Sequence, residues 1–209
     1  MISESKVSQA LLIATGLACR RGHDTLFDNL SFEILPGQII WLRGQNGRGK
    51  TSLLRQIVGL AQPEKGLLTW SKPDLVYIGH TNALKVDLSA LEALRFLVQL
   101  RNRPCTPTLL NRALTRMALG HRAHILVRAL SQGQRRRVAM ARLVLEDSAS
   151  LWVLDEPFES LDPQGIDVVN NLMLEHVGRG GSIILTSHLA LTMNGASVQT
   201  LDLAAAQSS

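Results

Sequence analysis

The segment from residue 44 to residue 51 constrains the fold of this chain more than any other. It reads Gly-Gln-Asn-Gly-Arg-Gly-Lys-Thr and fits the pattern G-x-x-x-x-G-K-[ST] in full. The apolar residues 38–43 before it predict a buried strand, and the periodic residues 51–60 predict a helix after it. A glycine-rich turn between a strand and a helix lets backbone N–H groups converge at a positive helix end. The sequence therefore predicts a phosphate-binding loop (residues 44–51) on an α/β sheet.

Every residue of this phosphate loop, and the serine after it, is a candidate nucleotide ligand. Lys50 is expected to bridge the β- and γ-phosphates, and Thr51 is expected to offer its hydroxyl to Mg²⁺. The expected cofactor-binding residues of this segment are Gly44, Gln45, Asn46, Gly47, Arg48, Gly49, Lys50, Thr51 and Ser52.

A continuous apolar segment, residues 151–154, ends in two carboxylates, Asp155 and Glu156. Such a segment is typical of a strand in a parallel sheet, whose carboxyl ends form the ligand-binding edge. Asp155 is therefore expected beside the phosphate loop, where it can hold Mg²⁺ through water. Glu156 is expected to polarise the attacking water.

The residues Leu130-Ser131-Gln132-Gly133-Gln134, here named the signature segment, predict a second anion site. Ser131 and Gln134 have the spacing of a capping box, which indicates a helix N-terminus. A hydroxyl, a glycine and a positive helix end can together bind a phosphate. Since one chain then carries two phosphate sites, the second is expected to serve the nucleotide of another subunit.

Composition limits the partners of the chain. Its 209 residues suffice for one sizeable core, and no apolar run approaches the roughly 20 residues that span a bilayer. A net charge of +5 is compatible with nucleic acid, a membrane surface or a phosphate-rich ligand, and the low aromatic content of 4% disfavours nucleic acid among the three. The apolar residues 10–19 lack a basic cluster before them, so an edge strand is expected there and not an export signal.

The middle of the chain is expected to be helical. Helices are predicted over residues 89–102, 107–119 and 131–146, while strand and helix alternate toward both ends. After Asp162 and Pro163, a further helix is expected, and residues 182–186 predict another buried strand. The apolar face of that further helix is formed by Ile166, Val169, Met173 and Val177. We therefore expect one α/β domain over residues 1–209, with a helical insertion at about 85–145.

The order of these motifs resembles the ATP-binding-cassette (ABC) ATPases. Phosphate loop, signature segment, acidic strand, Ser160-Leu161-Asp162 and Thr186-Ser187-His188 follow one another between about Leu12 and Leu203. The resemblance implies a P-loop ATPase core with an N-terminal antiparallel β part, and ATP and Mg²⁺ as cofactors. It also implies a head-to-tail homodimer in the ATP-bound state, with Asp162 in the loop that crosses the interface. His188 would contact the γ-phosphate and the attacking water, which makes Glu156, His188 and Lys50 the expected catalytic residues.

The chain departs from the family pattern at three positions. His80 stands where the family carries a glutamine, so it remains a candidate ligand of the nucleotide and the metal, beside Thr51 and Asp155. Gln132 replaces a glycine, which the first turn of a helix tolerates. Arg21 stands near the place of an adenine-stacking aromatic; its guanidinium can stack as well, or it can be solvated.

Within the family the chain resembles most closely the ATP-binding subunit of the haem exporter of cytochrome c maturation. The matching pieces are residues 17–22, 43–55, 77–80, 133–137 and 155–158. This resemblance implies transmembrane permease subunits as partners and a place on the cytoplasmic face of the inner membrane, with membrane association through those partners only. ATP turnover would release a haem-loaded chaperone or transport haem.

Other functions fit the sequence less well. An ATPase subunit of a lipid or lipoprotein exporter would carry the same motifs and is the nearest alternative. A non-transport cassette ATPase of DNA repair would need a long coiled coil, and none is indicated between the phosphate loop and the signature segment. A small-molecule kinase would have no use for the signature segment.

Overall fold

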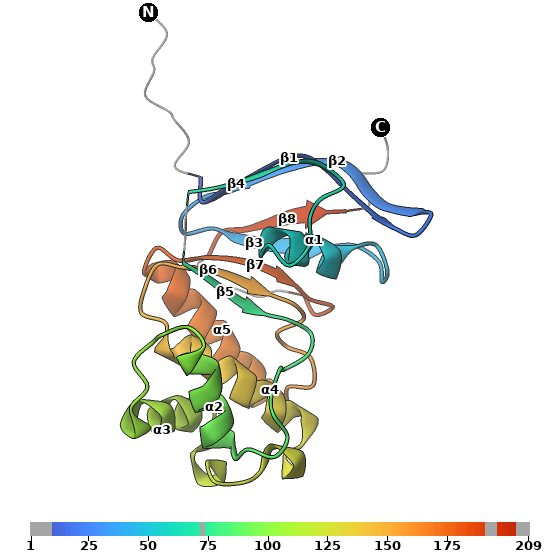
Figure 1. Ribbon diagram of the computed structural model, residues 1–209. Coiled ribbons are helices and arrows are strands. Elements are labelled where there is room, and N and C mark those ends of the chain that lie inside the picture. Colours follow the sequence, from blue (N-terminus) through green and yellow to red (C-terminus); the bar gives the residue numbers. More distant parts are fainter. Residues whose placement is uncertain (1–9, 72–73, 191–195, 204–209) are drawn as a thin grey trace, which may run out of the picture. The chain divides into compact units, whose positions relative to one another are not determined.

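The computed structural model describes residues 10–71, 74–190 and 196–203 and divides the chain into two compact units (Figure 1). The first unit comprises the chain up to Tyr77, residues 148–155 and the chain from His176 onward. The second unit comprises residues 78–147 and 156–175. The assignment of the whole chain to a single domain stays a prediction.

A three-stranded antiparallel sheet forms one layer of the first unit. Its strands are β1 (Leu12–Arg21), β2 (Asp24–Ile34) and β4 (Lys65–Trp70), in the order β2-β1-β4. Because β1 pairs with β2 on one side and with β4 on the other, it is the central strand. The expectation of an edge strand over residues 10–19 is therefore wrong. The alternating burial of Leu12 and Ala14 fits either position, and only the pairing decides between them.

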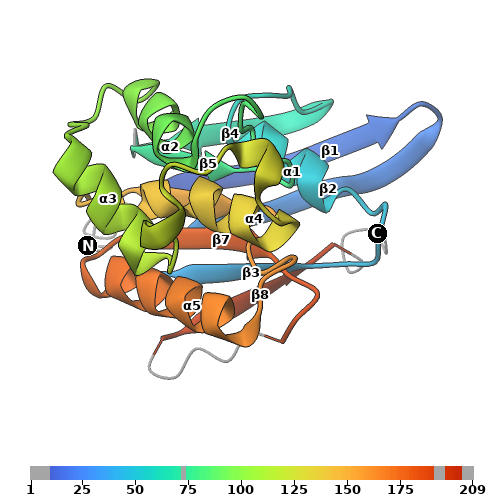
Figure 2. The ribbon, with the colours of Figure 1, turned by 90° about the horizontal axis from the view of Figure 1, so that it is seen from below.

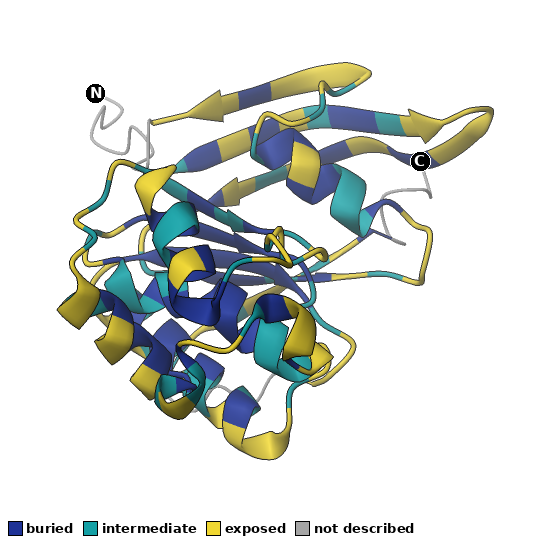
Figure 3. Ribbon diagram, turned by 60° about the horizontal axis from the view of Figure 1, so that its bottom comes forward, coloured by how far each residue is buried: buried dark blue, intermediate teal, exposed yellow. Residues whose placement is uncertain are grey.

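The second sheet has the order β5-β6-β7-β3-β8. Its strands are β3 (Ile39–Arg43), β5 (Leu75–Ile78), β6 (Leu151–Leu154), β7 (Ser182–Thr186) and β8 (Val198–Asp202). Strand β3 pairs in parallel with β7 and β8, and β6 pairs in parallel with β7. All residues of β6 and β7 are buried, as the dark blue strands of Figure 3 show. Strands that are buried along their whole length are typical of a parallel sheet.

Helix α1 (Lys50–Ile57) lies between the two sheets of the first unit (Figure 1). Its buried residues Leu53, Leu54 and Ile57 belong to one apolar cluster with Leu12 of β1 and Leu42 of β3. The helix that begins at the phosphate loop is thus fixed by the core, because its apolar face has the helical spacing of three and four residues.

The second unit is mainly helical (Figure 2). It contains α2 (Ala90–Gln99), α3 (Pro107–Arg116) and α4 (Gln132–Met140), which begin after the side-chain caps Ser89, Thr106 and Ser131. Short 3-10 helices cover Gly120–Arg122, Val127–Ala129 and Ala141–Leu145. The predicted single helix over 131–146 is therefore wrong in its second half. There Ala141 and Leu143 are buried, and the 3-10 segment packs against α3, so tertiary packing sets the tighter turns.

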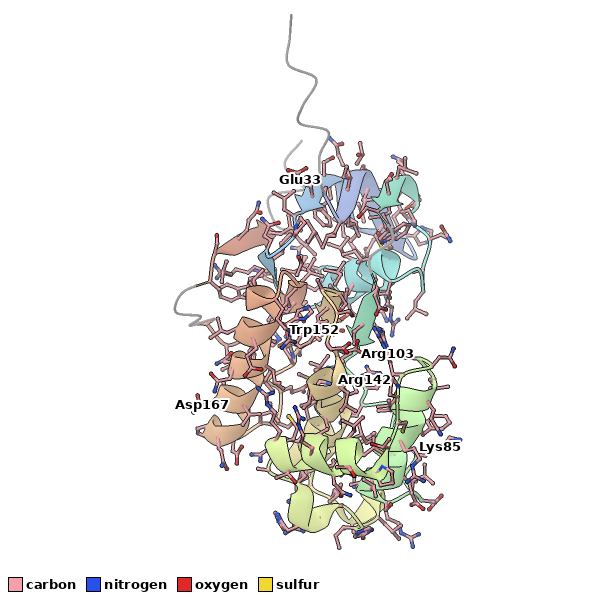
Figure 4. The ribbon with its side chains drawn as sticks, turned by 90° about the vertical axis from the view of Figure 1, so that its left-hand side faces the viewer. Glu33, Lys85, Arg103, Arg142, Trp152 and Asp167 are labelled. Atoms are coloured by element: carbon pink, nitrogen blue, oxygen red, sulfur yellow. The ribbon has the colours of Figure 1, made fainter. Side chains whose placement is uncertain are left out.

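A buried carboxylate ties two loops of the second unit together. Glu146 accepts ion pairs from Arg101 Nε at 3.2 Å and from Arg103 at 3.3 Å. Arg142 of the same unit is half-buried, and the desolvation of its guanidinium lowers its pKa to about 10 (Figure 4 labels Arg103 and Arg142). A buried charge is tolerated only when it is paired, so the Glu146 carboxylate and its arginines depend on each other.

Helix α5 (Pro163–Gly178) ends in the first unit. Of its expected apolar face, Val169 and Met173 are fully buried, but the sequence prediction missed His176, which is also fully buried. The His176 ring stacks on Trp152 of β6 with ring centroids 3.8 Å apart, and its Nε2 donates to the Ser150 carbonyl at 2.8 Å (Figure 4 labels Trp152). Across the described ranges of the chain, no helix is long and apolar enough to cross a membrane.

Burial makes His176 a source of acid sensitivity. Its pKa is lowered to about 4, chiefly by burial, against about 6.5 for an unfolded histidine. Between these two values the unfolded chain binds one more proton than the folded chain. The free energy of unfolding therefore falls as the pH drops from about 6.5 to about 4. The other five histidines are exposed.

We predict that His176→Phe flattens this dependence, because phenylalanine can stack on Trp152 but cannot take up a proton. The Ser150 carbonyl keeps its bond from the Ser182 N–H at 3.1 Å in this variant. Urea unfolding of both proteins at several pH values between 4 and 7 measures the difference. Identical pH slopes in the two proteins would show that His176 does not carry the effect.

Candidate functional site

The phosphate loop connects β3 to α1 as the sequence predicts. Gly49 precedes the helix with φ 92°, and a Cβ atom there would lie 3.0 Å from Leu26 and 3.1 Å from Phe27 of β2. Only glycine fits this left-handed and crowded position without strain. No side chain caps the N-terminus of α1, so its first backbone N–H groups can turn to a ligand. The loop residues Gln45, Asn46, Gly47 and Arg48 are exposed.

Lys50 lies over its own loop. Its Nζ donates to the Gly44 carbonyl at 2.7 Å and to the Gln45 carbonyl at 3.3 Å. Lys50, Gly44 and Gln45 line a cavity of about 540 Å³ together with His188. The structure therefore brings three of the expected phosphate ligands and His188, the expected contact of the γ-phosphate, to one cavity of the first unit.

Asp155 occupies the end of β6 and is 2% exposed. Its Oδ2 accepts a hydrogen bond from the Thr51 hydroxyl at 2.8 Å, and its Oδ1 accepts one from the Thr186 hydroxyl at 2.8 Å. The hydroxyls come from α1 and from β7, so two neighbouring elements hold one buried carboxylate. The sequence places Thr186 only within a motif and predicts no contact for it. Because Thr186 ends the buried strand β7 beside β6, its hydroxyl can donate to Asp155.

The oxygen atoms of Thr51 and Asp155 fit a magnesium ion. Mg²⁺ prefers hard oxygen ligands and is usually bound by one or two protein groups, with phosphate and water completing its shell. Among the residues that the structure describes, no group of three or more His, Cys, Asp or Glu side chains could hold a metal ion.

Sequence reasoning missed Trp41 and Arg43, which line the same cavity from β3. The Trp41 indole N–H donates to the Ser187 carbonyl at 3.3 Å, directly before His188. The Arg43 guanidinium lies 4.7 Å from the centre of the Trp41 ring. Their spacing of two residues on a strand could have shown that they share a face. It could not have shown that this face meets the turn after β7.

The signature segment begins α4 in the second unit. The Ser131 hydroxyl accepts from the Gln134 N–H at 3.2 Å, and the Gln134 side chain accepts from the Ser131 N–H at 3.0 Å. The predicted capping box is confirmed. Gly133 is required because a Cβ atom there would lie 2.3 Å from the Ser160 carbonyl oxygen. A cavity of about 460 Å³ is lined by Ala118, Leu119, Ser131, Gln132, Gly133, Gln134, Arg137, Ser160 and Asp162.

Asp162 lines this second cavity and directly precedes α5. Its Oδ1 accepts from the Gly165 N–H at 2.9 Å and pairs with Arg137 of α4. The Gly165 N–H and the guanidinium hold the pKa of the Asp162 carboxyl below its usual range. The carboxylate thus joins the start of α5 to the signature helix.

His80 and Glu156 also belong to the second unit. His80 Nδ1 lies 3.0 Å from Glu159 Oε2, and both side chains are largely exposed. Glu156 has φ 49°, a left-handed conformation that is rare for a residue with a side chain. Three expected residues, Lys50, Asp155 and His188, therefore lie in the first unit, and His80, Glu156 and Asp162 lie in the second.

Comparison with known proteins agrees with these motifs. The ABC transporter family pattern matches residues 27–159. The cytochrome c biogenesis ATP-binding export protein CcmA of Methylococcus capsulatus is 42% identical over 200 residues, which are 90% of this chain and 96% of that protein. The CcmA protein of Nitrosomonas europaea is 38% identical over 202 residues, 91% of this chain and 94% of its own length.

Solved structures confirm the predicted fold class. An ABC transporter ATP-binding protein from Pyrococcus furiosus superposes with a TM-score of 0.80 at 22% identity, covering 93% of this chain and 98% of that one. The ATP-binding subunit of another ABC transporter gives a TM-score of 0.79 at 24% identity, with 92% and 85% covered. The architecture is therefore a P-loop core with a helical insertion and an N-terminal antiparallel β part.

We predict that Lys50→Ala abolishes ATP binding, because it removes the ammonium that lies over the phosphate loop. Titration with a fluorescent ATP analogue measures the affinity. Arg55→Ala is the matched control, since Arg55 is an exposed cation in the last turn of the same helix. Wild-type affinity in Lys50→Ala, with the control also unchanged, would contradict the role given to the loop.

Proposed function

Since this chain belongs to the ABC transporter ATP-binding family, we propose that it binds MgATP between two copies of itself and hydrolyses it to drive a membrane partner. The observation that carries this proposal is the buried Asp155 carboxylate, held by the Thr51 and Thr186 hydroxyls. It puts an oxygen site for a cation directly beside the helix that begins at the phosphate loop.

The residues of the first unit bind the triphosphate in this proposal. The backbone N–H groups of residues 44–52 cradle the phosphates, and Lys50 exchanges its bonds to loop carbonyls for bonds to the β- and γ-phosphates. Thr51 and Asp155 would hold Mg²⁺, which would neutralise charge on the phosphate oxygens. His188 lines the cavity with Lys50 and reaches the γ-phosphate and the water.

Glu156 acts as the general base in the hydrolysis step. The water oxygen attacks the γ-phosphorus while its proton passes to the Glu156 carboxylate, and the bond to the β-phosphate oxygen breaks. ADP and inorganic phosphate are the products. In the transition state the negative charge is spread over the γ-phosphate oxygens. Lys50 and His188 stabilise this charge by electrostatic attraction and hydrogen bonding.

The second cavity of the chain serves the partner copy's nucleotide. A hydroxyl and a positive helix end are presented there by Ser131, Gln132, Gly133 and Gln134, and Asp162 lines the same cavity. The Ser131 hydroxyl accepts a bond from its own helix and keeps its proton to donate to a phosphate oxygen. Head-to-tail dimerisation gives two equal composite sites, which is the closed symmetric arrangement expected of a homodimer.

His80 connects hydrolysis to the membrane partner in this proposal. It follows β5 and precedes the helices of the second unit, and its ring is exposed. It can also contribute a nitrogen ligand or a hydrogen bond near the metal, as the sequence predicts. Arg136 donates hydrogen bonds both to the Gly79 carbonyl, next to His80, and to the Glu156 carbonyl. A partner that moves the His80 loop can therefore change the position of Glu156.

The biological process we propose is haem delivery in cytochrome c maturation. The support is the similarity to cytochrome c biogenesis ATP-binding export proteins over nearly the full length of both chains. The partners would be the transmembrane permease subunits of the haem exporter. These subunits would hold the chain at the cytoplasmic face of the membrane, and nucleic acid is not a partner in this proposal. The turnover of ATP then releases a haem-loaded chaperone or moves haem itself.

We predict that Glu156→Gln keeps ATP binding but slows hydrolysis about 10²–10⁴-fold, because the amide cannot accept the proton. With products no longer formed, an ATP-held dimer accumulates and elutes from size exclusion at about twice the 22.9 kDa of one chain. Asp167→Asn, on the exposed side of α5, removes a carboxylate from the same unit and serves as the control (Figure 4). A monomer with normal turnover would refute both the base and the dimer.

We further predict that deleting the gene abolishes covalent haem attachment to c-type cytochromes and leaves b-type cytochromes intact. A strain that carries only the Glu156→Gln protein is expected to lose covalent haem attachment as the deletion strain does, because the pathway needs the free energy of ATP hydrolysis and not only the presence of the protein. Haem-stained gels of denatured membrane and periplasmic fractions measure this. Normal c-type bands in the deletion strain would favour another exporter, such as one for lipid or lipoprotein release, over the haem pathway.

A further inference from the structure

A buried arginine of the signature helix joins two loops of the second unit. Arg136 lies in α4, five residues after Ser131, and is only 3% exposed. One terminal nitrogen donates to the Gly79 carbonyl at 2.8 Å and to Asn82 Oδ1 at 3.1 Å. The other donates to the Glu156 carbonyl at 2.9 Å. The two ends of one planar guanidinium thus hold two different segments of the chain.

The bond to Glu156 acts on a residue in an uncommon backbone conformation. Glu156 has φ 49°, and its carbonyl also accepts from the Glu159 N–H at 3.1 Å. The left-handed conformation is unfavourable for a residue with a Cβ atom, so it persists only where its surroundings fix it. A charge-assisted hydrogen bond from a buried guanidinium is the stronger of the two bonds to this carbonyl. Arg136 therefore fixes the backbone that aims the Glu156 carboxylate.

The bonds to Gly79 and Asn82 act on the loop that carries His80. His80 itself pairs with Glu159, which is three residues after Glu156. These contacts form a closed ring. Arg136 bonds Gly79, which precedes His80, and His80 pairs with Glu159. The Glu159 N–H then bonds the Glu156 carbonyl, which also accepts from Arg136. The His80–Glu159 pair is exposed, so it is weak, and Arg136 is the buried and stronger link of the ring.

We propose that Arg136 is a positioning residue for hydrolysis, which couples the His80 loop to the orientation of Glu156. This inference rests on the proposed function, in which Glu156 takes the proton of the attacking water. A displacement of residues 79–82 would move the Arg136 guanidinium, which is hydrogen-bonded to them. Since the guanidinium also bonds the Glu156 carbonyl, the displacement would change the orientation of Glu156. Hydrolysis then depends on the position of a loop that does not itself carry the base.

The role requires arginine in particular. A lysine ammonium is a single point and cannot donate at once to acceptors at both ends of a planar fork. A glutamine side chain is shorter, is neutral and has one donating nitrogen. Arg135 is a matched control on the same helix, because it also donates to backbone carbonyls, but to Val127 at 3.0 Å and to Arg128 at 2.9 Å.

The test compares Arg136→Gln, Arg136→Lys and Arg135→Gln in the full-length chain. We expect Arg136→Gln to lower kcat about tenfold or more, while the Kd of a fluorescent ATP analogue changes less than about threefold. Arg136→Lys is expected to lie between Arg136→Gln and the wild type, and Arg135→Gln to stay within about twofold of the wild type. Thermal unfolding of each variant reports whether it is folded.

Combination with Glu156→Gln separates positioning from general destabilisation. If Arg136 acts through Glu156, Arg136→Gln causes no further loss of the residual turnover of Glu156→Gln, because the group it orients is gone. An equal loss in both backgrounds would overturn the proposal, and so would a weakened Kd with unchanged kcat. If Arg136→Gln does not fold, Arg136→Lys decides: a lowered kcat with unchanged Kd supports the role, and a wild-type kcat refutes it.

The outcome also distinguishes this inference from the proposed function. Turnover that persists in both Lys50→Ala and Glu156→Gln would refute the proposed function itself. Turnover that depends on Lys50 and Glu156 but not on Arg136 would leave that function intact and refute only the positioning role.

Discussion

The first unit depends on a buried carboxylate that must find partners inside the fold. Leaving Asp155 without hydrogen bonds at 2% exposure would cost several kcal/mol. The bonds from Thr51 and Thr186 offset that cost. Both hydroxyls can bond Asp155 only if β7 lies next to β6 and if the turn after β3 places the start of α1 at the same edge of the sheet. The strand order β6-β7-β3 satisfies this condition. The group that serves magnesium in the proposed function thus also constrains the topology.

The two phosphate sites of the proposed function differ in how the N-terminus of the helix is capped. Helix α1 has a left-handed glycine before it and no side-chain cap, so its first N–H groups remain available for phosphates. Helix α4 has a complete capping box, in which Ser131 and Gln134 satisfy each other's backbone N–H groups. The capping box leaves the N–H groups of Gln132 and Gly133 unused, so this helix end offers them together with the hydroxyl proton of Ser131 and the field of the helix.

The second unit is organised by three consecutive arginines of α4. Arg135 bonds the Val127 and Arg128 carbonyls, Arg136 bonds the loops at Gly79 and Glu156, and Arg137 pairs with Asp162. Successive residues of a helix point about 100° apart, so three neighbours reach three different segments. In a sequence, such a run is easily taken for a solvated charged face. Here Arg136 and Arg137 are buried, and each holds a segment of the functional site.

The sequence by itself determined the phosphate loop, the acidic strand, the capping box of the signature segment and the α/β class. Each of these follows from local chemistry: glycines permit a turn, apolar runs form buried strands, and a serine with a glutamine three residues on caps a helix. The tertiary structure alone decided that β1 is a central strand and that α4 tightens into 3-10 turns after Met140. It also decided that His176 stacks on Trp152 in the core, and that Trp41 and Arg136 contact the candidate site. These results depend on pairing and packing between residues far apart in the chain. No local pattern can report them, because a strand's neighbours and a side chain's acceptors exist only once the chain has folded.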